Sequence, residues 1–151
     1  MTHTHHGSCI VLGEAGVLIR GASGSGKSGL ALELIHREQA AGRFACLVAD
    51  DQVVLEACTG RVVARCPEGI EGLIELRGHG LVKIPHLKRA VVRLLVDIEP
   101  VCKIERLPEP VDQAQEVCGV SLRRQAVPAE DFPAAVRLVQ AALQHHTLPI
   151  D

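Results

Sequence analysis

Aromatic side chains are almost missing from this sequence of 151 residues, which contains two Phe, no Tyr and no Trp. Sites that stack nucleic-acid bases or sugars on exposed rings are therefore excluded, because they need several such rings. The chain can still bury a core, since 47% of its residues are hydrophobic and 23% are charged, a balance typical of a globular domain. That core has to be built from Val, Leu, Ile and Ala.

A strong charge of either sign is also absent, because 16 Lys and Arg against 18 Asp and Glu leave a net charge of −2. We therefore expect no binding to nucleic acid and no attachment to an anionic membrane surface. No apolar run reaches the ~18 residues that a membrane span needs. The segment from Met1 to His6 lacks the basic-then-apolar pattern of a secretory signal, and we interpret it as a flexible, histidine-rich tail.

Paired cysteine motifs are missing as well. The six cysteines include no CxxC pair that would begin a zinc site. Most of them lie in apolar stretches, where cysteine behaves as a small buried hydrophobe. We expect a reduced, cytoplasmic protein with a single domain over residues 1–151.

Short apolar runs that alternate with turns predict an α/β domain with a mixed β-sheet. A hairpin is expected from strands 9–12 and 17–20 around the turn 13–16, followed by a helix from Ser28 to Ala41 that Gly42 ends. Asp131 and Pro133 are expected to begin a C-terminal helix with Val136, Val139 and Leu143 on one face. The other predicted strands are 44–49, 53–55, 62–64, 73–76, 81–84 and 91–98.

A phosphate-binding motif follows the first hairpin. The segment Gly21-Ala22-Ser23-Gly24-Ser25-Gly26-Lys27-Ser28 fits G-x-x-x-x-G-K-[ST] and lies between an apolar strand and an amphipathic helix. Its glycines allow successive N–H groups to face a phosphate at the helix N-terminus. Lys27 can reach the β- and γ-phosphates, and the Ser28 hydroxyl can bind Mg²⁺. The alternative is a Gly- and Ser-rich turn that matches by chance.

An acidic pair, Asp50-Asp51, follows the apolar run 44–49. A P-loop needs a carboxylate for its metal on a neighbouring strand, and this is the obvious candidate. On an extended chain successive side chains point in opposite directions, so one acid can face the metal and the other a substrate hydroxyl. Two solvated aspartates in a turn are the alternative.

A third cluster is Ile74-Glu75-Leu76-Arg77-Gly78-His79-Gly80. Alternation places Glu75 and Arg77 on one face, where Glu75 could be a second metal carboxylate and Arg77 could clamp a phosphate. An edge strand with a surface ion pair explains the same pattern. The chain then carries five basic residues and no acidic residue between Arg77 and Arg93, which indicates a solvated face or a surface for an anionic ligand or acidic partner protein.

These motifs, together with His6-Gly7 ahead of the first strand, resemble in order the catalytic domain of HPr kinase/phosphorylase. The resemblance covers roughly residues 6–98, and the 74–80 segment is similar to the family's own signature. It implies a P-loop kinase-like (phosphoenolpyruvate carboxykinase-like) fold with a mixed sheet, a P-loop helix and a C-terminal helix. It also implies a short form that consists of the catalytic domain only.

The resemblance implies an activity as well. ATP and Mg²⁺ would be the cofactors, and a serine of the phosphocarrier protein HPr would receive the phosphate. In the reverse reaction inorganic phosphate would attack the phosphoserine and release pyrophosphate. The family's V-P-x-x-x-G-R stretch has no clean counterpart near Ala126-Val127-Pro128, so the kinase direction is better supported. A homo-oligomer, hexameric in long-form relatives, would be the assembly.

Individual roles follow by position from the same resemblance. Lys27 would contact the donor phosphates, while Ser28 and Glu75 would bind Mg²⁺. Asp51 would take the proton from the seryl hydroxyl, Asp50 would assist it, and His6 would lie in the active site. The arginine that acts on the phosphates is Arg77 or lies near Lys88 and Arg89.

Two other classes of function remain compatible with the residues. One is a P-loop kinase for a small-molecule acceptor, and the other is a non-catalytic nucleotide sensor that signals through a partner. In every case the shortage of aromatic side chains predicts weak selectivity for the nucleotide base.

Overall fold

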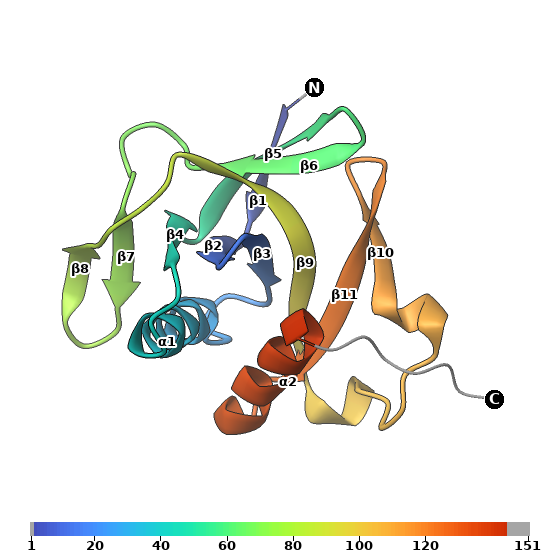
Figure 1. Cartoon of the computed structure of the whole chain (residues 1–151). Coiled ribbons are helices and arrows are strands. Elements are labelled where there is room, and N and C mark those ends of the chain that lie inside the picture. Colours follow the sequence, from blue (N-terminus) through green and yellow to red (C-terminus); the bar gives the residue numbers. More distant parts are fainter. Residues whose placement is uncertain (1, 145–151) are drawn as a thin grey trace.

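The computed structural model describes residues 2–144, and Figure 1 labels its strands and helices. The strands are β1 (Thr2–His6), β2 (Ser8–Leu12), β3 (Ala15–Arg20), β4 (Ala45–Ala49), β5 (Gln52–Cys58), β6 (Arg61–Arg65), β7 (Leu73–Leu76), β8 (Gly80–Lys83), β9 (Arg89–Glu99), β10 (Ala114–Val117) and β11 (Val120–Pro128). The helices are α1 (Lys27–Ala40), α2 (Phe132–Gln144) and two short 3₁₀ helices, η1 (Val101–Lys103) and η2 (Pro110–Gln113).

Most of the strands form one curled, mixed sheet in the order β1-β5-β6-β9-β3-β2-β4, with β11 also on β9 and β10 on β11. The β3–β9 and β9–β11 pairs are parallel, and the other named pairs of this sheet are antiparallel. The hairpin β7–β8 stands apart. The predicted α/β class with a mixed sheet, a P-loop helix and a C-terminal helix is thus confirmed.

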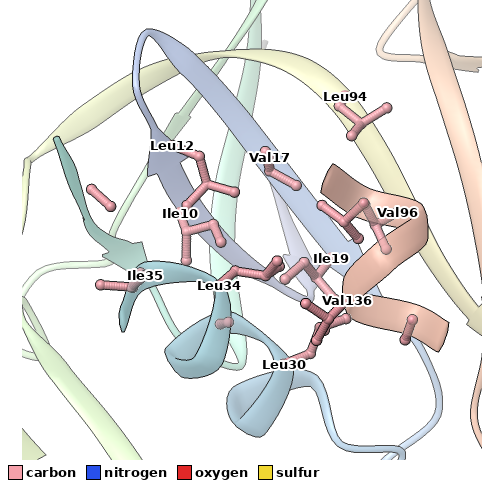
Figure 2. Close-up of a cluster of buried hydrophobic side chains, with 14 of the residues drawn as sticks. Ile10, Leu12, Val17, Ile19, Leu30, Leu34, Ile35, Leu94, Val96 and Val136 are labelled. Atoms are coloured by element: carbon pink, nitrogen blue, oxygen red, sulfur yellow. The ribbon is translucent and has the colours of Figure 1, made fainter. Parts of the chain in front are cut away.

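Alternation along the central strands divides the core in two. Val17 and Ile19 of β3 belong to a cluster under α1 and α2 (Figure 2), whereas Leu18 between them belongs to a second cluster that β5 and β6 cover. The first cluster consists of Val, Leu, Ile and Ala, as the composition predicts, and the buried residues of the second are Val, Leu, Ala and Cys. The only two phenylalanines of the sequence, Phe44 and Phe132, are on the surface.

The first hairpin is confirmed, but its turn is tighter than expected. Gly16 lies inside β3 and not in the turn. β9 passes so close to it that a Cβ at this position would lie 2.3 Å from the carbonyl oxygen of Val91, which explains the glycine. The P-loop helix begins at Lys27, one residue before the expected start, and Leu30, Ala31, Leu34 and Ile35 form its buried face.

Two expectations were wrong. Residues 2–6 are not a tail but the edge strand β1, which pairs with β5 from Thr2↔Glu56 to His6↔Gln52; Met1 lies outside the described residues. Polar alternation in T-H-T-H-H gives no apolar pattern that would predict it. Phe44 is not part of a buried strand, because β4 begins at Ala45 and Phe44 is 57% exposed.

The C-terminal third contains structure that the sequence did not predict, namely β10, β11 and the two 3₁₀ helices. α2 begins as expected, since the Asp131 carboxylate accepts a hydrogen bond from the amide of Ala134, which is a side-chain N-cap. Val136 and Val139 are buried under the sheet and Leu143 packs beside them. None of the helices in the described residues is long and apolar enough to cross a membrane.

All six cysteines are free thiols. Only Cys9, Cys46 and Cys66 are buried, so three of the six cysteines are inside, whereas we expected most of them there. Burial raises the pKa of the Cys9 thiol to about 12, which keeps this group protonated and inert at neutral pH.

Candidate active site

The P-loop connects β3 to α1, and its backbone explains its glycines. Gly24 and Gly26 have φ values of 78° and 98°, in the left-handed region that favours glycine. Gly26 caps α1 with no side-chain hydrogen bond to the helix N-terminus. Unsatisfied N–H groups and the helix dipole at such an end attract anions, so the loop can receive a phosphate group.

The Lys27 side chain reaches back over this loop. It is only 6% exposed, and its Nζ donates to the carbonyl oxygens of Gly21 and Ala22, both at 3.1 Å. These contacts hold the ammonium group at the mouth of the loop, where a terminal phosphate would lie.

Ser28, the last residue of the motif, contacts the end of β4. Its hydroxyl donates to Asp50 Oδ1 at 2.7 Å. A second hydroxyl, that of the fully buried Ser8, donates to the same oxygen at 2.9 Å, and the Glu75 amide donates to Asp50 Oδ2 at 3.3 Å. Asp50 is therefore fixed against the P-loop by three donors from three different elements.

Asp51 points elsewhere, toward solvent and β1. Its carboxylate lies 2.7 Å from His6 Nε2, and the two side chains are 66% and 50% exposed. Its φ of 67° is left-handed, so the two acids diverge because the chain turns between them and not through strand alternation. The Gly7 amide donates to the Asp51 carbonyl at 2.9 Å, and the Asp51 amide donates to Ser8 Oγ at 3.2 Å.

The tripeptide His6-Gly7-Ser8 thus contacts both acids. Gly7 also lies so close to β3 that a Cβ there would be 2.9 Å from the Ile19 carbonyl oxygen. The sequence reasoning missed Ser8 altogether, although a lone hydroxyl at the start of the apolar run Cys9-Ile10-Val11-Leu12 was a usable signal, because a buried polar group needs a partner.

The β7–β8 hairpin brings Arg77 to the loop. A Cβ built on Gly24 would lie 3.7 Å from Arg77 Nη2, so this guanidinium is beside the P-loop. Arg89 instead lies on β9 opposite Arg65 of β6. Of the basic candidates, Arg77 is therefore the one that this contact puts at the P-loop.

The donors here fit Mg²⁺, which prefers oxygen ligands and uses one or two carboxylates together with phosphates and water. The Ser28 hydroxyl and the Asp50 carboxylate supply such oxygens side by side. Glu75 is exposed, with its backbone amide bound to Asp50. No group of three His, Cys, Asp or Glu side chains among residues 2–144 forms a metal cage.

Behind the P-loop, Asp97 of β9 joins two arginines. Arg20 donates to both of its carboxylate oxygens at 2.8 and 3.0 Å, and Arg124 of β11 donates at 2.7 Å. Burial alone would raise the pKa of Asp97, but the hydrogen bonds from Arg20 and Arg124 outweigh it and hold this pKa below its ordinary value. The network ties the residue before Gly21 to the neighbouring strands.

A cavity of about 1090 Å³ opens beside this network, between β11, α2 and the 103–115 segment. Arg20, Asp97 and Arg124 line it, but none of the P-loop residues does. Asp50 and Asp51 do not line it either, and the Asp51 side chain is 66% exposed on the open surface.

Comparisons with known proteins agree with this geometry. The family model of the HPr serine kinase C-terminal domain matches residues 1–150. HPr kinase/phosphorylase of Bordetella pertussis is 34% identical over 99% of this chain and 50% of its own length, and that of Azoarcus sp. is 36% identical over 89% and 45%. The chain thus spans about half the length of these curated relatives. The structure of the HPr(Ser) kinase/phosphatase from Coxiella burnetii matches with a TM-score of 0.77 at 26% identity, over 93% of this chain and 96% of that one.

Proposed function

The chain belongs to the HPr serine kinase C-terminal domain family, and from this we propose that it is an enzyme that transfers the γ-phosphoryl group of ATP to a serine of HPr. One observation carries the proposal: two adjacent carboxylates serve two different partners. Asp50 is hydrogen-bonded to the P-loop serine, and Asp51 is hydrogen-bonded to an exposed histidine on the open side. A donor side and an acceptor side thereby meet at one dipeptide.

On the donor side, the P-loop amides and Lys27 would bind the β- and γ-phosphates. Arg77, beside Gly24, would neutralise charge on the transferred group. Ser28 and Asp50 would hold Mg²⁺, with Glu75 as a further ligand from the β7–β8 hairpin. When bound there, Mg²⁺ would offset charge on the phosphoryl oxygens.

On the acceptor side, a neutral seryl hydroxyl is a poor nucleophile and gains from a base within hydrogen-bond reach. Asp51 would accept its proton as the seryl oxygen attacks the γ-phosphorus and the bond from that phosphorus to the bridging oxygen of ADP breaks. His6, at 2.7 Å from Asp51 Oδ1, would keep the carboxylate turned toward the acceptor.

The reverse direction uses the same groups. Inorganic phosphate in the P-loop would attack the phosphoserine, Asp51 would return the proton to the serine, and pyrophosphate would leave. We propose the kinase direction as the main one, since the sequence lacks the family's V-P-x-x-x-G-R stretch.

Two further properties are part of the proposal. The six free thiols favour a reducing compartment, the cytoplasm. The family resemblance favours a homo-oligomer, which light scattering of the purified chain would measure.

The decisive experiment incubates the protein with γ-labelled ATP, Mg²⁺ and HPr from the same organism, followed by phosphoamino-acid analysis. We expect the label on a serine of HPr. Label on a small molecule of a cell extract would identify a small-molecule kinase, and nucleotide binding without transfer would identify a sensor.

A further inference from the structure

The dyad of His6 and Asp51 lies at one end of a sheet face that neither long helix covers. In β1, Thr4 and His6 share a face, because His3 and His5 between them pair with Leu55 and Val53 of the inner core. The outer face therefore starts at His6 and continues over β5, β6 and the first residues of β9. Figure 1 shows both long helices on the side away from β5 and β6.

The strand register places two arginines on this outer face. Thr4 is opposite Val54, Val54 is opposite Arg65, and Arg65 is opposite Arg89. Directly opposite residues of antiparallel strands point to the same side. With strands about 4.8 Å apart and about 3.4 Å per residue, Arg65 and Arg89 lie on the order of 12–16 Å from His6 across the sheet.

The charge of this face is almost all positive. Arg61, four residues before Arg65 on the same strand, shares its side, and the exposed Lys88 precedes Arg89. We call Arg61, Arg65 and Arg89 the basic face. Glu56, opposite Val63, is the carboxylate that β5 contributes to it, and within residues 2–144 none of these four side chains forms an ion pair.

Such an arrangement costs stability. Like charges directly opposite each other on neighbouring strands repel, and the Arg65–Arg89 pair has no carboxylate to relieve it. The cost is offset when an external anion supplies the missing charge. Because the neighbouring dyad is half exposed and faces the same side, the natural partner is the molecule that presents its hydroxyl to Asp51.

We propose that the basic face is the docking surface for the acceptor protein, which carries acidic side chains on the order of 12–16 Å from its phosphorylated serine. The inference rests on the proposed function and specifies how that acceptor is recognised. A free phosphate or a nucleotide is a poorer fit, since the P-loop and Arg77 already receive phosphate at the other side of Asp50.

The test compares the double variant Arg61→Gln/Arg65→Gln with a control of equal charge change, Arg37→Gln/Arg137→Gln, on the two helices. We expect the KM for HPr to rise about five- to tenfold in the first variant only. The kcat and the KM for ATP stay within about twofold of wild type. When the NaCl concentration is raised from 50 to 250 mM, the KM of the wild type for HPr should increase, and the KM of the double variant should increase much less.

Thermal unfolding separates docking from structural support. Loss of Arg65 removes its repulsion with Arg89, so the Tm should stay unchanged or rise, and a fall in Tm would contradict the proposal. If the double variant does not fold, the single variant Arg65→Gln supplies the KM for HPr. An unchanged KM for HPr, or a loss of kcat at saturating HPr, overturns docking while the proposed function stands. Wild-type protein that transfers nothing to HPr overturns the proposed function and this inference with it.

Discussion

The hydroxyl of Ser8 lies 2.9 Å from Asp50 Oδ1 and 3.2 Å from the amide nitrogen of Asp51, so one fully buried side chain contacts both acids of the site. It connects the start of β2 to the end of β4, and it shares Asp50 Oδ1 with the P-loop serine. The relative positions of the Asp50 and Asp51 carboxylates therefore depend on a residue outside the recognised motifs.

Ser8→Ala should damage both stability and turnover. Loss of the hydroxyl leaves the Asp51 amide without its partner, which costs about 1–3 kcal/mol and lowers the Tm by roughly 3–10 °C. Misplaced carboxylates should lower kcat on the order of tenfold or more. Ser121→Ala, an exposed serine on β11, is the control, and equal kcat values in the two variants would contradict the role of Ser8.

Asp50→Asn and Asp51→Asn should separate the two acids. Asp51→Asn should keep nucleotide affinity within about twofold while phosphoryl transfer falls by about 10²–10⁴. Asp50→Asn should raise the Mg²⁺ concentration needed for half-maximal rate by about tenfold or more. Titrations of ATP and Mg²⁺ in the transfer assay measure both, with Glu116→Gln on β10 as the matched control. Near wild-type transfer by Asp51→Asn would show that the base lies elsewhere.

Two glycines should respond in opposite directions to alanine. Gly29 is an exposed helical glycine with open space around its Cβ position, so Gly29→Ala should stabilise the protein by about 0.5–1 kcal/mol. Gly7→Ala would push a Cβ against the Ile19 carbonyl and should destabilise it by about 1–3 kcal/mol. Urea unfolding of both variants checks this, and a stable Gly7→Ala protein would refute the tight contact between Gly7 and β3.

Asp97→Asn should destabilise the protein on the order of 3 kcal/mol, because it leaves Arg20 and Arg124 facing a neutral group. The pKa of Asp97 is lowered in the folded state, so its contribution is present above its unfolded pKa and is lost as pH falls through the folded one. The difference in the free energy of unfolding between wild type and variant should be constant above about pH 5 and shrink below about pH 4. Glu33→Gln, which breaks the exposed pair with Arg37, should cost under about 1 kcal/mol at every pH. A stability difference between wild type and Asp97→Asn that grows in acid would contradict the predicted pH dependence.

ATP and GTP should serve as donors with kcat/KM values within about tenfold of each other, a difference of about 1.4 kcal/mol. The reason is that recognition relies on the loop amides, Lys27 and the phosphates, and that the chain has few rings to stack on a base. Parallel transfer assays with both nucleotides measure the ratio. A preference of a hundredfold or more would reveal a base-reading pocket that neither the sequence nor the fold predicts.

Local motifs predicted the structure around the P-loop well. The P-loop lies between the predicted strand and the predicted helix. Both could be predicted because the apolar residues of each recur with the period of that element. The end of β4 also lies next to Ser28, as the acidic pair suggested. These features depend on residues close together in the sequence, where propensity and periodicity act directly.

Features that depend on distant partners were not predictable in this way. β1 is a strand only because β5, some 50 residues later, offers it an edge. β11 contains Arg123, Arg124 and Gln125 in a row, and this polar run gives no pattern that predicts a strand. The second arginine, Arg124, donates a hydrogen bond to Asp97 of β9. Asp51 faces away from Asp50 because of a left-handed turn, which no alternation rule supplies.

The place of β9 between β3 and β6 has a consequence for the order of folding. β3 holds the P-loop at its end, yet its partner on one side begins at Arg89. While the chain is being synthesised, the strand that carries the phosphate loop is an open edge until some 80 further residues have emerged, and such edges pair readily with the wrong chain. The strand that ends at the P-loop, although it precedes β9 by some 70 residues in the sequence, is thus among the later parts of the fold to be completed.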